Sequence, residues 1–183
     1  MNFQSEYGED LWLWENHHDY FRFPRYYVDL GCAGPVYLSQ TYFLRELGWK
    51  GLHIDGDESW AKEWNGQMIH AIVSDKPSVH FARSHAACLS RVEDGIPNAP
   101  AVSLQSILEA FYVDKVGFMS VDVEGHEYEA LRSFDIGRYE PQFLVVEYNT
   151  AGKGEDFRAK EYLESQGYTV IHTTPSNHIF KRD

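Results

Sequence analysis

Short apolar runs alternate with segments of helical spacing along most of the chain, and this alternation limits the fold more than any other feature. The runs are rich in β-branched and aromatic residues, which favours buried strands, whereas the segments between them repeat their apolar residues at helical intervals. Strands that alternate with helices predict a mostly parallel sheet with helices on both faces. We expect strands at 26–32, 50–56, 70–74, 116–123, 142–148, 168–173 and 179–181, a further short strand at 79–82, and helices at 38–47, 58–64, 104–111, 126–134 and 157–165.

The last two expected strands are joined by a short connection that contains Pro175, Ser176 and Asn177. This connection is too short for a crossover, so the two strands form a hairpin and the final strand runs antiparallel to its neighbour. We therefore predict an α/β fold whose seven-stranded, mostly parallel sheet ends in an antiparallel hairpin. The chain contains no linker, repeat or low-complexity tract, and 1–183 is expected to be a single domain.

The charge and cysteine content narrow the choice of partners and compartment. The net charge is −12, which repels phosphate backbones and anionic lipid, so neither nucleic acid nor a membrane is expected as a partner. Cys32 and Cys88 lie far apart outside any CxxC spacing, which suits a reducing compartment. We find neither a secretory leader nor an apolar stretch long enough to span a bilayer, and we expect a cytoplasmic location.

The loop after the first strand has the composition of a ligand-binding turn. Doubly wound sheets bind ligands at the carboxyl ends of their strands. The small residues Gly31, Cys32, Ala33 and Gly34 would let a bulky ligand approach the backbone, and the Asp29 carboxylate would orient the loop or attract an ammonium group. Similar turns also follow buried strands in proteins that bind no ligand there, so this loop alone does not establish a binding site.

The second and third strands also end in acids. Asp55 and Gly56 follow the glycine turn by about 25 residues, close to where such folds place the acid that binds a ribose diol. A carboxylate suits this role because its two oxygens accept from two adjacent hydroxyls, although Asp55 would equally suit the cap of the helix expected at 58. Ser74 and Asp75 either accept from an adenine amino group or form an ordinary turn.

Polar residues cluster where the strand at 116–123 ends. Asp122 and Glu124 share a face if the strand continues through them, and polar groups at the mouth of a buried strand are costly unless used. We predict a chemical role for both, with His126 nearby, whereas Glu127 is expected to cap the next helix. Glu147 ends the following strand, and the same argument predicts a chemical role for it. A second interpretation, which ranks lower, has Asp122, Glu124 and His126 binding Mg²⁺ or Mn²⁺.

Five segments of the chain resemble motifs of the FkbM-type methyltransferases. The most specific is the stretch 120–127, and the others are 4–10, 28–41, 47–55 and 146–149. The chain departs from the family pattern at Pro35, which fixes φ and removes a donor, and at Asp55, where a longer glutamate is usual.

The resemblance implies a Rossmann-like class I methyltransferase that uses S-adenosylmethionine to methylate a hydroxyl of a sugar, glycan or polyketide-like product. Asp122 or Glu124 would act as the base, with His126 and Glu147 in reserve. The residues expected to bind the cofactor are Asp29, Gly31, Cys32, Ala33, Gly34, Ser39, Asp55, Gly56, Ser74, Asp75 and Asp122.

Two other functions stay open at this point. A nicotinamide-dependent oxidoreductase would also suit the glycine turn and Asp55, but the C-terminal hairpin and the 120–127 stretch speak against it. A binding module that holds S-adenosylmethionine without turnover is conceivable because of Pro35. The expected partner is a small-molecule or glycan acceptor, and a second subunit or a fused or associated biosynthetic enzyme would complete an open acceptor pocket.

Overall fold

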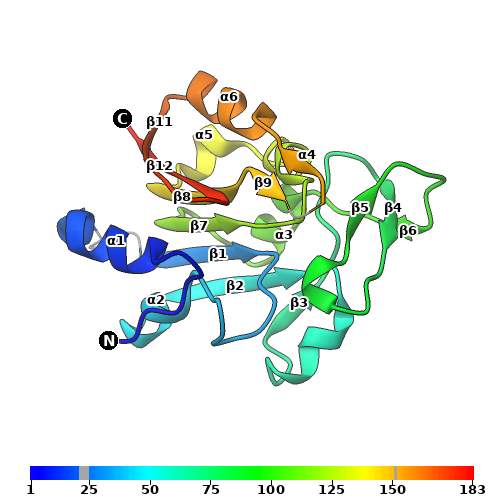
Figure 1. Ribbon diagram of the computed structural model, residues 1–183, viewed down its shortest axis with the longest axis horizontal. Coiled ribbons are helices and arrows are strands. Elements are labelled where there is room, and N and C mark those ends of the chain that lie inside the picture. Colours follow the sequence, from blue (N-terminus) through cyan, green and yellow to red (C-terminus); the bar gives the residue numbers. More distant parts are fainter. Residues whose placement is uncertain (21–24, 151) are drawn as a thin grey trace.

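A seven-stranded sheet forms the centre of the computed structural model, which describes residues 1–20, 25–150 and 152–183 (Figure 1). The strand order is β11-β12-β8-β7-β1-β2-β3. The strands β12 and β8, and β12 and β11, pair antiparallel, and the other neighbours pair parallel. The strands are β1 (Tyr26–Leu30), β2 (Lys50–Asp55), β3 (Met68–His70), β7 (Phe118–Val121), β8 (Phe143–Glu147), β11 (Tyr168–Thr173) and β12 (Asn177–Arg182). This arrangement confirms the predicted Rossmann-like methyltransferase fold with its C-terminal hairpin.

Both faces of the sheet are covered, which explains why the central strands are mostly apolar and almost fully buried. Alternate residues of β1 point to opposite faces, so Val28 joins one core cluster and Tyr27 joins the other. The first cluster includes residues of α3, α4, α5 and α6, and the second includes residues of α1 and α2. The helices are α1 (Glu9–His17), α2 (Tyr42–Glu46), α3 (Leu104–Ala110), α4 (Glu127–Leu131), α5 (Ile136–Tyr139) and α6 (Arg158–Ser165).

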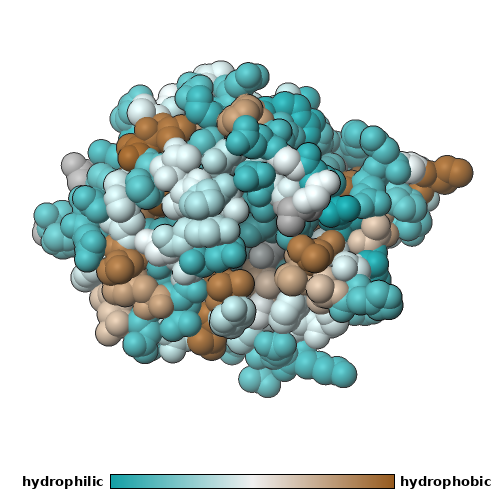
Figure 2. Space-filling model, in the orientation of Figure 1, coloured by the Kyte–Doolittle hydropathy of each residue, from teal (hydrophilic) through white to brown (hydrophobic). Residues whose placement is uncertain are grey.

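Smaller elements surround this core. A three-stranded sheet of β4 (Ser78–Ala82), β5 (Arg91–Glu93) and β6 (Ala99–Pro100) lies on the right of Figure 1, beyond β3. The pair β9 (Asn149–Thr150) and β10 (Gly154–Glu155) follows β8, and three short 3₁₀ helices occupy η1 (His18–Tyr20), η2 (Glu58–Lys62) and η3 (Ala87–Leu89). On the face shown in Figure 2, apolar residues form small separate patches among polar ones.

Several predicted boundaries were wrong. The helix expected at 38–47 is limited to α2 because Leu38 has a left-handed φ of 61°, which a helix cannot contain. The third strand lies at Met68–His70 rather than 70–74, and Val73 makes only an isolated bridge to Val102. The helix expected at 58–64 is a 3₁₀ helix.

Helix α1 was not predicted, and its position depends on two buried carboxylates. Asp10 Oδ2 accepts from the Gln4 and Ser5 amides at 2.6 and 3.2 Å, which fixes the segment before the helix. Glu9 Oε1 accepts from Thr174 Oγ1 and Asn177 Nδ2 at 3.0 and 2.8 Å. The N-terminal segment is therefore tied to the C-terminal hairpin, next to the carboxyl ends of the strands.

The ends of β1 and β7 meet at Gly31. The Asp122 amide donates to the Leu30 carbonyl at 2.9 Å, and a Cβ atom on Gly31 would lie 1.6 Å from the Asp122 carbonyl oxygen. Gly31 also has a φ of 79°. Only glycine fits this contact, and the contact fixes where Asp122 leaves β7.

We predict that Gly31→Ala destabilises the protein far more than Gly66→Ala. Gly66 has nearly the same φ, 78°, but a Cβ atom at this position would meet nothing within 4 Å, so its substitution should cost only about 1–2 kcal/mol from the left-handed backbone. The clash at Gly31 adds to that cost. Urea unfolding of both variants measures the difference, and equal losses would show that the contact with Asp122 is unimportant.

Candidate active site

A cavity of about 600 Å³ lies at the carboxyl ends of the central strands. Residues that end β1, β2, β7 and β8 form its floor, and the N-terminal segment, the η3–β5 region and the β9–β10 turn contribute to its walls. The strand order reverses between β1 and β7, and doubly wound sheets bind ligands at such a switch point. The volume is in the range of small-molecule sites.

Most of the predicted site residues line this cavity. Those predicted to bind the cofactor and found on the cavity wall are Asp29, Gly31, Cys32, Ala33, Ser39, Asp55, Gly56 and Asp122, and the predicted bases Glu124, His126 and Glu147 also line it. Gly34 packs instead against Trp60 and Glu63. Ser74 is buried beneath His126, and Asp75 is exposed and faces Arg132 at 3.8 Å. These last three residues are not part of the cavity wall.

The glycine loop is held by β2 rather than left open for a ligand. The amides of Gly31 and Cys32 donate to the Ile54 carbonyl at 2.8 and 3.2 Å, and the Ala33 amide donates to Asp55 Oδ2 at 2.9 Å. At Gly31 the Asp122 backbone makes a close approach, and Gly31 also lines the cavity, so its role toward a ligand stays a prediction. The loop therefore offers none of these three amides to a phosphate group.

Asp55 is oriented by two backbone amides. Its Oδ2 accepts from Ala33 and its Oδ1 from Asp57 at 2.8 Å, so each oxygen keeps one lone pair for a ligand. Asp55 does not cap the following helix, because the Asp57 carboxylate accepts from the Ser59 amide at 3.0 Å and takes that role. Burial raises the pKa of Asp55.

Asp29 is almost completely buried, with 3% of its surface exposed. Thr41 Oγ1 donates to Asp29 Oδ2 at 2.6 Å. Burial raises the pKa of Asp29 to about 6, and the hydrogen bond from Thr41 opposes this rise. Asp29 is thus a carboxylate with a hydrogen-bond donor but no direct cationic partner among the described contacts.

Three acids meet where β7 and β8 end. Asp122, Glu127 and Glu147 each have a carboxylate oxygen within 4.8 Å of the others. Burial, and then the charge of Glu147, raises the pKa of Asp122 well above its usual range. Burial, and then the charge of Glu127, raises the pKa of Glu147 to about 8. Asp122 and Glu147 lie close enough to share a proton, and the charge of Glu147 disfavours ionisation of Asp122.

Glu127 orders the loop between β7 and α4. Its Oε1 accepts from the amides of Val123 and Gly125 at 2.9 and 3.0 Å, which precede the helix, so the expected capping of α4 was wrong and the helix has no side-chain cap at its N-cap residue His126. Burial raises the pKa of Glu127 to about 7. The sequence did not indicate that Glu127 would also lie beside Asp122 and Glu147.

Glu124 does not continue the strand, contrary to our expectation. β7 ends at Val121, and Glu124 has a left-handed φ of 58°. Lys153 Nζ donates to the carbonyls of Glu124 and Val92, both at 3.0 Å, and thereby joins this loop to β5. Burial raises the pKa of the Glu124 carboxyl, which still lines the cavity.

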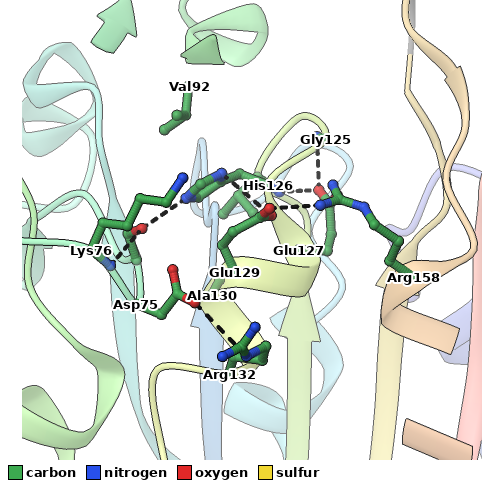
Figure 3. A network of polar contacts seen from close by, with 12 residues as sticks. Asp75, Lys76, Val92, Gly125, His126, Glu127, Glu129, Ala130, Arg132 and Arg158 are labelled. Atoms are coloured by element: carbon green, nitrogen blue, oxygen red, sulfur yellow. Dashed lines mark hydrogen bonds and ion pairs between the residues drawn. The ribbon is translucent and has the colours of Figure 1, made fainter. Parts of the chain in front are cut away.

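His126 belongs to a polar network beside the cavity (Figure 3). Its Nε2 lies 3.0 Å from Ser74 Oγ, and its Nδ1 lies 3.6 Å from Glu129 Oε2. Arg158 holds Glu129 from the other side at 2.7 Å. Burial lowers the pKa of His126, so the ring is neutral, and both nitrogens already face protein groups. Asp122 and Glu147 are therefore better placed than His126 to accept a proton.

The walls that rise above the strand ends were not predicted. Glu6 and Tyr7 reach the cavity from the segment before α1, and Ala87, Leu89 and Ser90 reach it from the η3 region. In the sequence, the segment 4–10 stands out only through the family resemblance. The η3 residues carry no periodic pattern that would have placed them there.

The acids that could gather around a metal ion differ from those we expected. Among the described residues, Asp122, Glu127 and Glu147 have the required spacing, whereas Glu124 and His126 do not join them. Oxygen ligands of this kind suit Mg²⁺ or Mn²⁺. Mutual repulsion of acids is also expected at such a site without an ion, so the metal stays a prediction.

The fold and the cavity define a methyltransferase of the Rossmann-like class. The chain matches the Methyltransferase FkbM domain over residues 29–170, and it therefore belongs to this family, which confirms the resemblance seen in the motifs. Comparison with curated proteins gave no match, and comparison with solved structures gave none either.

None of the helices formed by the described residues is long and apolar enough to cross a lipid bilayer.

We predict that the ligand-free protein loses stability as the pH rises. The folded-state pKa values of Asp29, Glu127 and Glu147, about 6, 7 and 8, exceed their usual values, so the folded state holds protons that the unfolded state has released. The free energy of unfolding then falls from about pH 4 to pH 8. Thermal unfolding across this range measures the slope.

Glu147→Gln should flatten this slope between pH 6 and 8, because a neutral amide has no proton to lose. Glu161→Gln, a change on an exposed residue of α6, serves as the control and should leave the slope as it is. A slope that Glu147→Gln does not alter would contradict the raised pKa.

Proposed function

We propose that this domain transfers a methyl group from S-adenosylmethionine to a hydroxyl of a glycan or a polyketide-like product. The observation that carries the proposal is the charge of the cavity wall. Among the described residues that line the cavity none is lysine or arginine, whereas six are acids: Glu6, Asp29, Asp55, Asp122, Glu124 and Glu147.

Such a wall suits a cation. S-adenosylmethionine carries a sulfonium and an ammonium group, and burial in a wall without lysine or arginine raises the pKa of five of these acids. A bound cation would supply the missing partner and favour their ionised forms. Asp29 is suited to the ammonium group, and the free lone pairs of Asp55 are suited to the ribose hydroxyls.

The same features disfavour a nicotinamide cofactor. A dinucleotide carries a diphosphate, which Rossmann dehydrogenases bind with the amides of the glycine loop at a helix N-terminus. Here the amides of Gly31, Cys32 and Ala33 donate to β2, and the next helix does not begin until Tyr42. Two negative charges would also face the acids without a lysine or arginine on the wall.

The residues at the end of β7 and β8 have the properties of a general base. When bound, S-adenosylmethionine supplies an electrophilic methyl group, and the protein has to orient the acceptor and take its proton. Asp122 is open to the cavity and is paired with Glu147. Asp122 accepts the hydroxyl proton, and Glu147 stabilises the protonated pair by its hydrogen bond. The backbone contact at Gly31 holds Asp122 in place.

We expect the ligand-free protein to bind S-adenosylmethionine and S-adenosylhomocysteine, and not NAD⁺. Isothermal calorimetry with all three ligands provides the measurement. Asp55→Asn should weaken binding of the adenosyl ligands, because an amide nitrogen cannot accept from a ribose hydroxyl. Heat with NAD⁺ and none with the adenosyl ligands would favour the oxidoreductase instead.

We expect Asp122→Asn to lower the rate of methyl transfer by roughly 10²–10⁴-fold, the usual contribution of a general base, while the adenosyl ligand still binds. Transfer of a labelled methyl group to a glycoside acceptor measures this effect. Asp114→Asn is a matched control, because Asp114 is exposed and precedes β7 at the opposite edge of the sheet. A chain that binds the ligand but transfers nothing even when unaltered would be a binding module.

A further inference from the structure

The wall of the cavity beside Glu147 is built by three distant segments. Asn177 pairs with Glu147 across β12 and β8, and the Asn149 amide lies 3.4 Å from the Ser176 carbonyl. Ser176 Oγ lies 3.5 Å from the Tyr7 hydroxyl, which brings the N-terminal segment to the same place. The residues of this acceptor wall are Glu6, Tyr7, Glu147, Asn149, Ser176 and Asn177.

Most hydrogen-bond donors of this acceptor wall are already used inside the protein. Asn149 Nδ2 donates to the Pro175 carbonyl at 3.1 Å, and Asn177 Nδ2 donates to Glu9 Oε1 at 2.8 Å. The Pro175 carbonyl and the Glu9 carboxylate act as acceptors, so each asparagine must direct its NH2 group toward its partner. The orientation of the two amide groups is therefore fixed. Thr150 Oγ1 likewise donates to Glu147 Oε2 at 2.8 Å.

The groups left for a ligand include several acceptors. They are the side-chain carbonyl oxygens of the two asparagines and the exposed carboxylate of Glu6, while the second N–H of each asparagine and the Tyr7 hydroxyl remain as donors, and Glu147 is shared with Thr150 and Asp122. A ligand that fits such a wall must bring donors of its own, and hydroxyl and ammonium groups do so.

No positive side chain compensates the acids of this wall among the described residues of the cavity. Lys153, on the far side of the Glu124 loop, directs its ammonium group to the carbonyls of Val92 and Glu124. A phosphate or carboxylate on the acceptor would therefore meet the acids of this wall with no lysine or arginine side chain lining the cavity, and this repulsion disfavours its binding.

We propose that the acceptor is a polyhydroxylated molecule that carries an ammonium group and no phosphate or carboxylate, as an amino sugar does. This inference rests on the proposed function. Ser176 and Asn177 lie outside residues 29–170, the range that matches the family, whereas Glu6 and Tyr7 belong to the segment 4–10 that resembles a family motif.

Three glycosides that differ in one substituent test the proposal: a hexosamine, a neutral hexose and a uronate. With the full chain and saturating S-adenosylmethionine, transfer of a labelled methyl group gives kcat/KM for each, and mass spectrometry identifies the methylated atom. We expect the hexosamine to exceed the neutral hexose several-fold, and the uronate to fall about 100-fold or more below it. A uronate that equals or exceeds the neutral sugar, methylation at nitrogen alone, or transfer to none of the three would overturn the proposal.

Glu6→Gln removes one charge from the acceptor wall and keeps the size of the side chain. It should bring the ratio of hexosamine to hexose turnover closer to one, whereas Glu15→Gln, on the exposed part of α1, should leave this ratio as it is. An unchanged ratio in Glu6→Gln would show that the Glu6 carboxylate does not recognise the ammonium group of the acceptor.

Calorimetry with S-adenosylmethionine alone distinguishes failure of the proposed function from failure of the acceptor proposal. If the cofactor does not bind, the proposed function is wrong, and the acceptor proposal that rests on it is wrong as well. If it binds and the ranking of the glycosides is reversed, only the acceptor class is wrong.

Discussion

The crowding of acids at the carboxyl edge of the sheet is the constraint on which the site depends. Three acids of the floor have donors from neighbouring segments, since Thr41 serves Asp29, two backbone amides serve Asp55, and Thr150 serves Glu147. These donors satisfy hydrogen bonds but carry no charge. Burial keeps several of the pKa values high, although Arg45 partly opposes the rise at Asp29, and a positively charged ligand would lower the electrostatic cost that remains.

The backbone geometry makes this crowding possible. The contact of Gly31 with the Asp122 carbonyl brings the ends of β1 and β7 together, and Asp29 and Asp122 consequently face the same cavity. Glu127 then fixes the following turn through the amides of Val123 and Gly125. The acids are therefore held by hydrogen bonds from main-chain amides and threonine hydroxyls, which do not require a bound ligand. We infer that the site is largely formed before the cofactor binds.

The sequence was informative where local pattern and burial agree. β1, β2, β7 and β8 are apolar because both faces of the sheet are covered, and the acids that follow them reach one edge because parallel strands end together. Leu38 and Glu124 could not be foreseen, because their left-handed backbone results from tertiary contacts rather than from residue type. Ser74 and Asp75 lie outside the cavity wall, although residues 71–73 line it, because Ser74 is buried against His126 and Asp75 is exposed beside Arg132. The contribution of Glu6 depends on the long-range hydrogen bonds of Glu9 to the hairpin, and no local pattern encodes them.

The raised pKa values also have a consequence for turnover. In the proposed reaction, methylation of a hydroxyl would release one proton, and a carboxylate with an ordinary pKa near 4 would be a weak base for it. The Asp122–Glu147 pair, in which the pKa of Glu147 is about 8, holds that proton more firmly at neutral pH. The same reaction removes the positive charge from sulfur, so the remaining acids lose a partner just as the pair gains a proton. Protonation of the pair thus offsets the lost cation, and the acids that attract the cofactor also limit the electrostatic cost that remains when the charge is gone.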